Sequence, residues 1–208
     1  MDIRLVVFDW SGTIIDDSRP VYETMSKIFD VFKKPMMPFD QWKSFMSNID
    51  SANIFKSHGI EGDPKKLGEL WETNLIKVIE NTKSIVYPDS VNIMQYIASK
   101  GKMIAVVSAQ PEDHVRKEAV ENGMSKFITR IIGEAFEKSI HLRYLCEEFG
   151  TDPRNAVYVG DMVGDIQAAK MAGMMSVAIT RGYNSEDILA VQKPDFIISE
   201  LSELRGIV

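Results

Sequence analysis

The chain begins with a short apolar run that ends in a carboxylate and a turn, Leu5-Val6-Val7-Phe8-Asp9-Trp10-Ser11-Gly12-Thr13. A β-branched run followed by Ser-Gly-Thr predicts a β-strand that terminates in a tight loop. Asp9 would then project from the carboxyl edge of a sheet, which is where open α/β sheets bind their ligands. This position makes Asp9 a candidate functional residue, although a single aspartate after a strand is also typical of a capped turn.

The composition restricts the class of partner. The 208 residues are 45% hydrophobic and 26% charged, which is ordinary for a globular chain with one core domain and a smaller appendage. The net charge of −6, without a basic block, argues against nucleic acid or an anionic membrane and favours a small-molecule ligand. The single cysteine, Cys146, excludes an internal disulfide, and no apolar run approaches the ~20 residues of a membrane span. Because no apolar signal segment is present, we expect a cytoplasmic protein, either a monomer or a homodimer.

From residue 87 onward, apolar strands alternate with helices. Strands are expected at residues 103–107, 128–132, 156–159, 176–179 and 196–198, and helices at 91–100, 111–122, 142–149 and 166–172. Strands that are apolar along their length and separated by helices predict a parallel sheet that is covered on both faces. The expected fold class is therefore α/β, with a doubly wound parallel sheet.

About seventy residues with helical character separate the first strand from this alternation. Apolar residues recur at helical spacing over residues 21–32 and 67–79, with shorter helices expected after Pro38 and within 49–60. A segment of this size cannot be a loop in a compact domain. We therefore expect a small all-helical cap domain, residues 16–85, inserted after the first strand of an α/β catalytic core formed by residues 1–15 and 86–208. Such a cap over the carboxyl edge of the sheet would exclude water from the reaction at Asp9.

Further polar residues occur where later strands end. Ser108 follows the second expected strand, and Asp161 follows the fourth, with Asp165 four residues further on. Together with Asp9, these carboxylates could bind a hard cation such as Mg²⁺, which prefers a few oxygen ligands together with substrate phosphate. Lys138 opens a helix, a position that the helix dipole disfavours for a cation. A bound anion beside Lys138 would explain this position better than a surface role.

In order and spacing, these stretches resemble the four motifs of the haloacid dehalogenase-like hydrolase superfamily: residues 8–13, Ser108, Lys138, and Gly160-Asp161-Met162-Val163-Gly164-Asp165. The similarity covers nearly the whole chain, and the helical insert resembles the mobile cap of that family. The resemblance implies a Rossmann-like fold and a Mg²⁺-dependent hydrolase that acts on a small phosphorylated metabolite.

The resemblance also implies a role for each matching residue. Asp9 would be the nucleophile that attacks phosphorus to give an aspartyl phosphate. The implied metal ligands are Asp9, the main-chain carbonyl of Ser11, Asp161 and Asp165, the last either as a ligand or as a supporting partner. The implied phosphate-binding residues are Thr13, Ser108 and Lys138, and Thr13 would also support the loop by hydrogen bonding. Lys138 would also offset negative charge as the phosphate dianion approaches the carboxylate.

One position departs from the family pattern. Phosphatases of this family carry an aspartate two residues after the nucleophile, where it protonates the leaving oxygen and later activates water; this chain has Ser11 there. A hydroxyl cannot do this general acid–base work near neutral pH, and such catalysis contributes roughly 10²–10⁴-fold. Ser11 is therefore a candidate catalytic residue that cannot act as the acid and base that the family aspartate supplies. Metal binding through the main-chain carbonyl of residue 11 is unaffected.

Three functions are compatible with these residues. The first is a phosphatase for a small phosphorylated metabolite, similar to the phosphoglycolate phosphatases. The second is carbon–phosphorus bond cleavage as in phosphonoacetaldehyde hydrolase, whose motif Asp-Trp-Ala-Gly-Thr is close to residues 9–13. That enzyme forms a Schiff base with a cap lysine, for which Lys43 and Lys56 are the candidates here. The third is binding of a phosphorylated ligand without turnover. The joint presence of four residues argues against it: Asp9, Ser108, Lys138 and Asp161.

Overall fold

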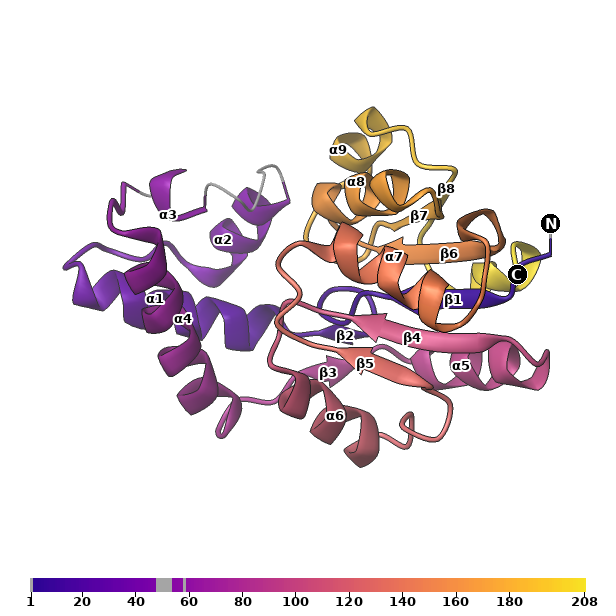
Figure 1. Cartoon of the computed structure of the whole chain (residues 1–208). Helices are drawn as coiled ribbons and strands as arrows, with labels where there is room; N and C mark the ends of the chain where they lie inside the picture. Colours follow the sequence, from indigo (N-terminus) through magenta and orange to yellow (C-terminus); the bar gives the residue numbers. More distant parts are fainter. Residues whose placement is uncertain (1, 48–53, 58) are drawn as a thin grey trace. The chain divides into compact units, whose positions relative to one another are not determined.

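The computed structural model describes residues 2–47, 54–57 and 59–208. The chain forms two compact units (Figure 1), of which the larger comprises Met1–Ile15 with Val86–Val208 and the smaller comprises Asp16–Ile85. None of the helices in the described residues is long and apolar enough to cross a membrane.

The larger unit is built on a six-stranded parallel sheet with the strand order β5-β4-β1-β6-β7-β8. Its strands are β1 (Leu5–Phe8), β4 (Met103–Val107), β5 (Arg130–Ile132), β6 (Ala156–Gly160), β7 (Met175–Ile179) and β8 (Phe196–Ile198). The first strand, β1, lies between β4 and β6, with Phe8 opposite Val106 on one side and Val159 on the other. The predicted α/β fold with a parallel sheet is thus confirmed, and the residue after β1 lies near the middle of the carboxyl edge.

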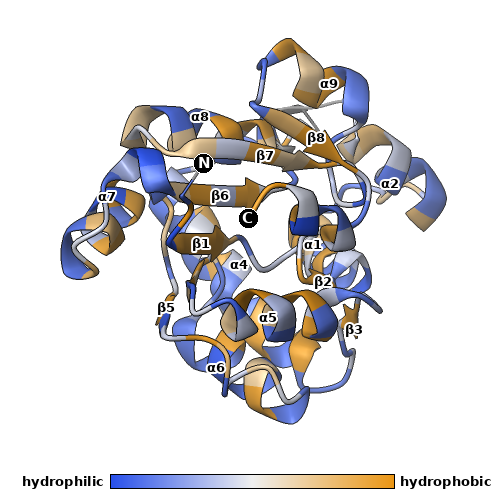
Figure 2. Cartoon of the chain, turned by 90° about the vertical axis from the view of Figure 1, so that its right-hand side faces the viewer, coloured by the Kyte–Doolittle hydropathy of each residue, from blue (hydrophilic) through white to orange (hydrophobic). Residues whose placement is uncertain are grey.

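Helices cover both faces of this sheet (Figure 1). They are α5 (Ser90–Ser99), α6 (Glu112–Glu121), α7 (Lys138–Glu148), α8 (Val163–Ala172) and α9 (Glu186–Val191), with short 3-10 helices at Pro153–Asn155 and Leu201–Gly206. Side chains of β1 alternate between two apolar clusters, since Val6 and Phe8 pack with residues of α5 and α6, and Leu5 and Val7 with residues of α7 and α8. Figure 2 shows the apolar character of β1 and β6 between these helices. Burial on both faces fixes the register of β1 and so the position of the residue that follows it.

Some elements differ from those expected. The strand expected at 128–132 begins only at Arg130, because the amide of Ile128 donates to the carbonyl of Ser125 in a turn. Two short strands, β2 (Ile15–Asp16) and β3 (Ile85–Val86), pair as a separate two-stranded sheet where the chain passes from one unit to the other. No strand was expected there, because two residues are too few to form an apolar pattern.

Within its described residues, the smaller unit consists of helices and the loops that join them, apart from the single residues that it contributes to β2 and β3. Its helices are α1 (Ser18–Val31), α2 (Phe39–Met46), α3 (Ile54–Ser57) and α4 (Pro64–Ile79). The ring of Tyr22 packs edge-on against those of Phe39 and Trp42, which joins α1 to α2. The short helix expected within residues 49–60 corresponds to α3, and residues 48–53 and 58 lie outside the described part of the chain. The role of this unit as a cap stays a prediction.

Candidate active site

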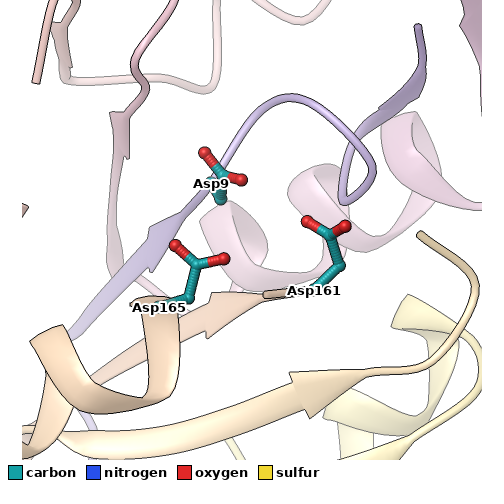
Figure 3. A group of neighbouring side chains, drawn as sticks. All are labelled: Asp9, Asp161 and Asp165. Atoms are coloured by element: carbon teal, nitrogen blue, oxygen red, sulfur yellow. The ribbon is translucent and has the colours of Figure 1, made fainter. Parts of the chain in front are cut away.

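Three carboxylates meet at the carboxyl ends of β1 and β6 (Figure 3). Asp9 directly follows β1, Asp161 directly follows β6, and Asp165 lies in the first turn of α8. All three residues are buried, and one carboxylate oxygen from each lies within 4.8 Å of the others. The structure therefore brings together residues of the first and fourth motifs, which are far apart in the sequence.

Lys138, the first residue of α7, supplies positive charge to this cluster. Its Nζ atom lies 2.9 Å from Oδ1 of Asp9 and 2.7 Å from Oδ1 of Asp165. Burial alone would lower the pKa of Lys138, but the neighbouring carboxylates of Asp165 and Asp9 outweigh this effect and raise it. The side chain is only 16% exposed, and the ammonium group stays charged in this largely buried site because of the two carboxylates.

The carboxylates hold more negative charge than Lys138 can offset. Burial raises the pKa of Asp9 to about 7, an effect that Lys138 opposes and Asp165 reinforces. Burial, together with the charges of Asp9 and Asp165, also raises the pKa of Asp161 well above its ordinary value. A divalent cation would relieve this repulsion and favour the ionised carboxylates. The three carboxylates offer only oxygen donors, which suits a hard cation such as Mg²⁺.

Asp161 and Asp165 have different hydrogen-bond partners. In Asp165, Oδ1 accepts from Lys138 Nζ at 2.7 Å and from the Tyr158 hydroxyl at 3.0 Å, and Oδ2 accepts from the amide of Met162 at 3.0 Å. In Asp161, Oδ1 accepts from the Thr13 hydroxyl at 3.2 Å, and Oδ2 accepts from the amide of Tyr183 at 2.6 Å. Asp165 thus has two donors on one oxygen, whereas each Asp161 oxygen has one and keeps a lone pair for a further ligand.

Glycines allow the backbone to pass close to these carboxylates. A Cβ atom at Gly12 or at Gly182 would overlap the carboxylate of Asp161, and one at Gly160 would overlap that of Asp165. Gly12 also has a backbone φ angle of +71°, which residues other than glycine rarely adopt. The Ser-Gly-Thr turn after Asp9 therefore needs its glycine both for the bend and for the space beside Asp161.

Gln110 forms hydrogen bonds with both Ser108 and Ser11. The backbone amide of Gln110 donates to the Ser108 hydroxyl at 3.1 Å, and its side-chain amide donates to the Ser11 hydroxyl at 2.7 Å. Sequence reasoning identified both serines but missed Gln110, for which the only signal was its position two residues after Ser108. The Thr13 hydroxyl contacts Asp161. A role for Thr13 toward phosphate stays a prediction.

The loop after β7 is a second contribution that sequence reasoning missed. The amides of Tyr183 and Asn184 donate to Asp161, the first to the carboxylate and the second to the main-chain carbonyl at 3.3 Å. The side chain of Asn184 accepts a hydrogen bond from the amide of Val163 at 3.0 Å, where α8 begins. This contact helps α8 to start earlier than residue 166, where its apolar pattern begins. In the sequence, Gly-Tyr-Asn resembles an ordinary turn.

The two lysines considered for a Schiff base both lie in the smaller unit. Lys43 Nζ is 3.8 Å from a carboxylate oxygen of Asp16, and its side chain is 49% exposed. Lys56, in α3, is also exposed. The described surroundings of these lysines are therefore those of surface residues within that unit.

Several known proteins are similar to this chain. A family model described as haloacid dehalogenase-like hydrolase matches residues 6–179. A phosphoglycolate phosphatase of Pasteurella multocida is 25% identical, and one of Haemophilus influenzae is 26% identical; each alignment covers 97% of this chain and 96% of the relative. Among solved structures, a predicted phosphoglycolate phosphatase from Haemophilus somnus has a TM-score of 0.80 at 21% identity, covering 100% of this chain and 98% of its own. A predicted phosphatase from Clostridium acetobutylicum has a TM-score of 0.86 at 15% identity, with the same coverage.

Proposed function

Because this chain belongs to the haloacid dehalogenase-like hydrolase family, as its motifs led us to expect, we propose that it is a Mg²⁺-dependent phosphatase for a small phosphorylated metabolite. Membership of the family makes the chain an enzyme of the hydrolase class. The observation that carries the phosphatase proposal is the buried pair of Asp9 and Lys138, 2.9 Å apart, beside two further carboxylates. The relatives named phosphoglycolate phosphatase, similar over nearly their whole length, support a compact phosphorylated acid as substrate.

The residues that would hold the metal ion are Asp9, Asp161 and the main-chain carbonyl of Ser11. Asp165 would support the site by orienting Lys138, because its oxygens already accept hydrogen bonds from three donors. When bound, the ion polarises the phosphoryl oxygens and offsets charge that Lys138 leaves uncompensated. We propose Mg²⁺ because the donor atoms are all oxygens.

Asp9 would act as the nucleophile. A carboxylate oxygen of Asp9 attacks phosphorus while the bond from phosphorus to the leaving oxygen breaks, and the leaving group departs with that electron pair. Lys138 and the hydroxyl of Ser108 would hold the phosphoryl oxygens during the transfer. Water then attacks phosphorus, which releases inorganic phosphate and restores the Asp9 carboxylate.

Ser11 limits what this site can do for the leaving group. Its hydroxyl, held by Gln110 at 2.7 Å, can donate a hydrogen bond but cannot transfer a proton near neutral pH as a carboxylic acid would. We therefore expect either slow turnover or a leaving oxygen of low basicity. Because the same residue cannot activate water well, the aspartyl phosphate should persist longer than in relatives that have an aspartate there.

The proposal also includes a role for the helical unit, a cellular location and an oligomeric state. The helical unit Asp16–Ile85 would serve as a cap that limits the access of water. We place the enzyme in the cytoplasm as a monomer or homodimer, without nucleic acid or membrane as partner.

The proposal is tested by measuring phosphate release from a panel of phosphorylated metabolites, including phosphoglycolate and acyl phosphates, with and without Mg²⁺. We expect metal-dependent release that Asp9→Asn abolishes and Asp161→Ala strongly reduces. Asp152→Asn is the matched control, because Asp152 pairs with exposed Arg154 away from the site. Full activity of Asp9→Asn, or no release from any substrate by the wild-type protein, would refute the proposal.

A further inference from the structure

Arg181, in the loop after β7, joins two segments of the larger unit that flank the helical insert in the sequence. Its Nη2 atom donates to the main-chain carbonyl of Thr13 at 2.8 Å, and Nη1 donates to Oδ1 of Asp89 at 2.6 Å. The guanidinium also lies over the ring of Tyr87, 4.0 Å from its centroid. The side chain is only 14% exposed, so one largely buried cation binds the chain just before residue 16 and just after residue 85.

These two segments are also bonded to one another. The amide of Tyr87 and the hydroxyl of Ser90 both donate to the carbonyl of Ile14, at 3.2 and 2.8 Å. The hydroxyl of Tyr87 donates in turn to the main-chain carbonyl of Arg181 at 3.2 Å. Arg181 therefore contacts the place in the larger unit where the outgoing and returning chains are fixed together.

The same arginine belongs to a closed ring of contacts around Asp161. Thr13, whose carbonyl Arg181 binds, donates its hydroxyl to Oδ1 of Asp161 at 3.2 Å. Tyr183, two residues after Arg181, donates its amide to Oδ2 at 2.6 Å, and Gly182 packs directly against the same carboxylate. Both oxygens of Asp161 are thus held by segments that Arg181 keeps together.

We propose that Arg181 is a positioning residue for the metal site, which fixes the orientation of the Asp161 carboxylate and ties it to the chain segments that flank the helical insert. This inference rests on the proposed function in one respect, namely that Asp161 is a metal ligand. Arginine suits the role because it is always charged and its planar fork reaches two acceptors at once, here Thr13 and Asp89. A lysine in its place would reach one of them.

The test is the affinity of the substrate-free protein for Mg²⁺ and Mn²⁺, measured by isothermal titration calorimetry. Loss of a residue that orients a metal ligand lowers metal affinity by roughly 10–100-fold. We expect Arg181→Met to weaken binding about 10-fold, and Arg181→Lys to weaken it less. Arg154→Met, which removes an exposed arginine that pairs with Asp152, is the matched control and should bind as the wild type does. Wild-type affinity in folded Arg181→Met would overturn the proposal.

A double-mutant cycle tests the route through Thr13. Thr13→Val removes the hydroxyl that contacts Asp161 but keeps the carbonyl that Arg181 binds. If Arg181 acts through this segment, the double variant should lose less affinity than the product of the two single losses. Independent, multiplicative losses would refute that route. Should Arg181→Met not fold, Arg181→Lys and Asp89→Asn decide the matter, because we expect both to fold and to bind metal more weakly than the wild type.

The outcome is separable from that of the phosphatase proposal. A wild-type protein that binds metal but releases no phosphate, with binding weakened in Arg181→Met, would refute the phosphatase and support the role of Arg181. Phosphatase activity in the wild type, with unchanged metal affinity in Arg181→Met, would support the phosphatase and refute the role of Arg181. A merely structural role of Arg181 would lower the melting temperature of the metal-free protein and leave the affinity of the folded variant unchanged.

Discussion

The side-chain amide of Gln110 donates a hydrogen bond to the hydroxyl oxygen of Ser11 over 2.7 Å. Gln110 is only 8% exposed, and its backbone amide donates to the hydroxyl of Ser108 at 3.1 Å. One residue therefore connects the loops that follow β1 and β4, which are neighbouring strands of the sheet. Because Oγ of Ser11 accepts from Gln110, its own proton remains available to a bound ligand. The side chain at position 11 is thus held by a neutral partner.

Asp9→Asn should stabilise the protein in the absence of metal. The Asp9 carboxyl ionises near pH 3.8 in the unfolded chain, whereas burial raises its pKa to about 7 in the folded protein. The folded state therefore binds more protons between these values, and its stability falls as the pH rises through this range. At pH 8 the asparagine variant should gain on the order of 1 kcal/mol or more in free energy of unfolding.

Urea denaturation in the presence of EDTA measures this effect at several pH values. The advantage of Asp9→Asn should shrink steadily as the pH falls from 8 to 5, because the wild-type carboxyl becomes protonated. Asp152→Asn, at an exposed position, serves as the control for an aspartate outside the site. An advantage that stays constant with pH, or a loss of stability at pH 8, would contradict the assignment of a raised pKa to Asp9.

Lys138→Met should have the opposite effect on stability. The substitution leaves the buried carboxylates of Asp9 and Asp165 without their cation, and breaking a buried ion pair in this way costs about 3–5 kcal/mol. The raised pKa of Lys138 means that its ammonium group stays charged below about pH 10, so deprotonation removes its contribution only at more alkaline pH.

The loss in Lys138→Met should diminish as the pH is lowered toward 5, because the carboxyls can then become neutral. Lys117→Met, on the exposed face of α6, is the control and should change the free energy of unfolding little. Equal stability of Lys138→Met and the wild type at pH 8 in EDTA would show that Lys138 does not compensate these carboxylates.

The meeting of distant residues at this site could be predicted because each of them stands at the end of an apolar strand or the start of a helix. In a parallel sheet these ends share one edge, so Asp9, Ser108 and Asp161 had to lie near one another once their strands were recognised. The family resemblance added functional roles, which no hydrophobic pattern supplies.

The supporting contacts could not be predicted in the same way. Gln110 and Arg181 act through hydrogen bonds to residues that are far away in the sequence, and such bonds leave no periodic signal in it. Likewise, Asn184 bonds the first amide of α8 from a loop that follows a different strand. These contacts depend on the strand order, which the alternation of strands and helices does not specify.

A trapping experiment separates phosphatase from carbon–phosphorus cleavage. Borohydride reduces a Schiff base, so phosphonoacetaldehyde plus borohydride should leave a stable adduct on Lys43 or Lys56 only if cleavage of that kind occurs. We expect no adduct, because nucleophilic lysines are activated by desolvation or by a neighbouring cation. Lys43 instead lies 3.8 Å from the Asp16 carboxylate, and both lysines are exposed. Mass spectrometry of the wild type, with Lys43→Met and Lys56→Met as controls, gives the answer; an adduct lost in either variant would favour the phosphonatase.

Ser11→Asp tests the chemistry of the leaving group. An aspartate at this position would place a general acid next to the nucleophile loop, and Gln110 Nε2, now 2.7 Å from the serine oxygen, could donate to the new carboxylate and hold it. Turnover of an alkyl phosphate should rise by up to roughly 10²-fold, the usual value of a positioned acid. An acyl phosphate should gain much less, because its carboxylate leaving group departs without being protonated.

The comparison of two substrates in two variants makes this test decisive. Ser11→Asn has nearly the shape of Ser11→Asp but no proton to transfer, so it should raise turnover on neither substrate. The new carboxylate also adds repulsion toward Asp9, which Mg²⁺ and Lys138 must offset, and metal affinity is therefore measured for each variant. A gain on the alkyl phosphate alone, in Ser11→Asp alone, would show that the missing acid limits a phosphatase. Equal effects on both substrates, or a loss on both with metal binding intact, would mean that Ser11 serves another chemistry, and the carbon–phosphorus hydrolase would then be the better assignment.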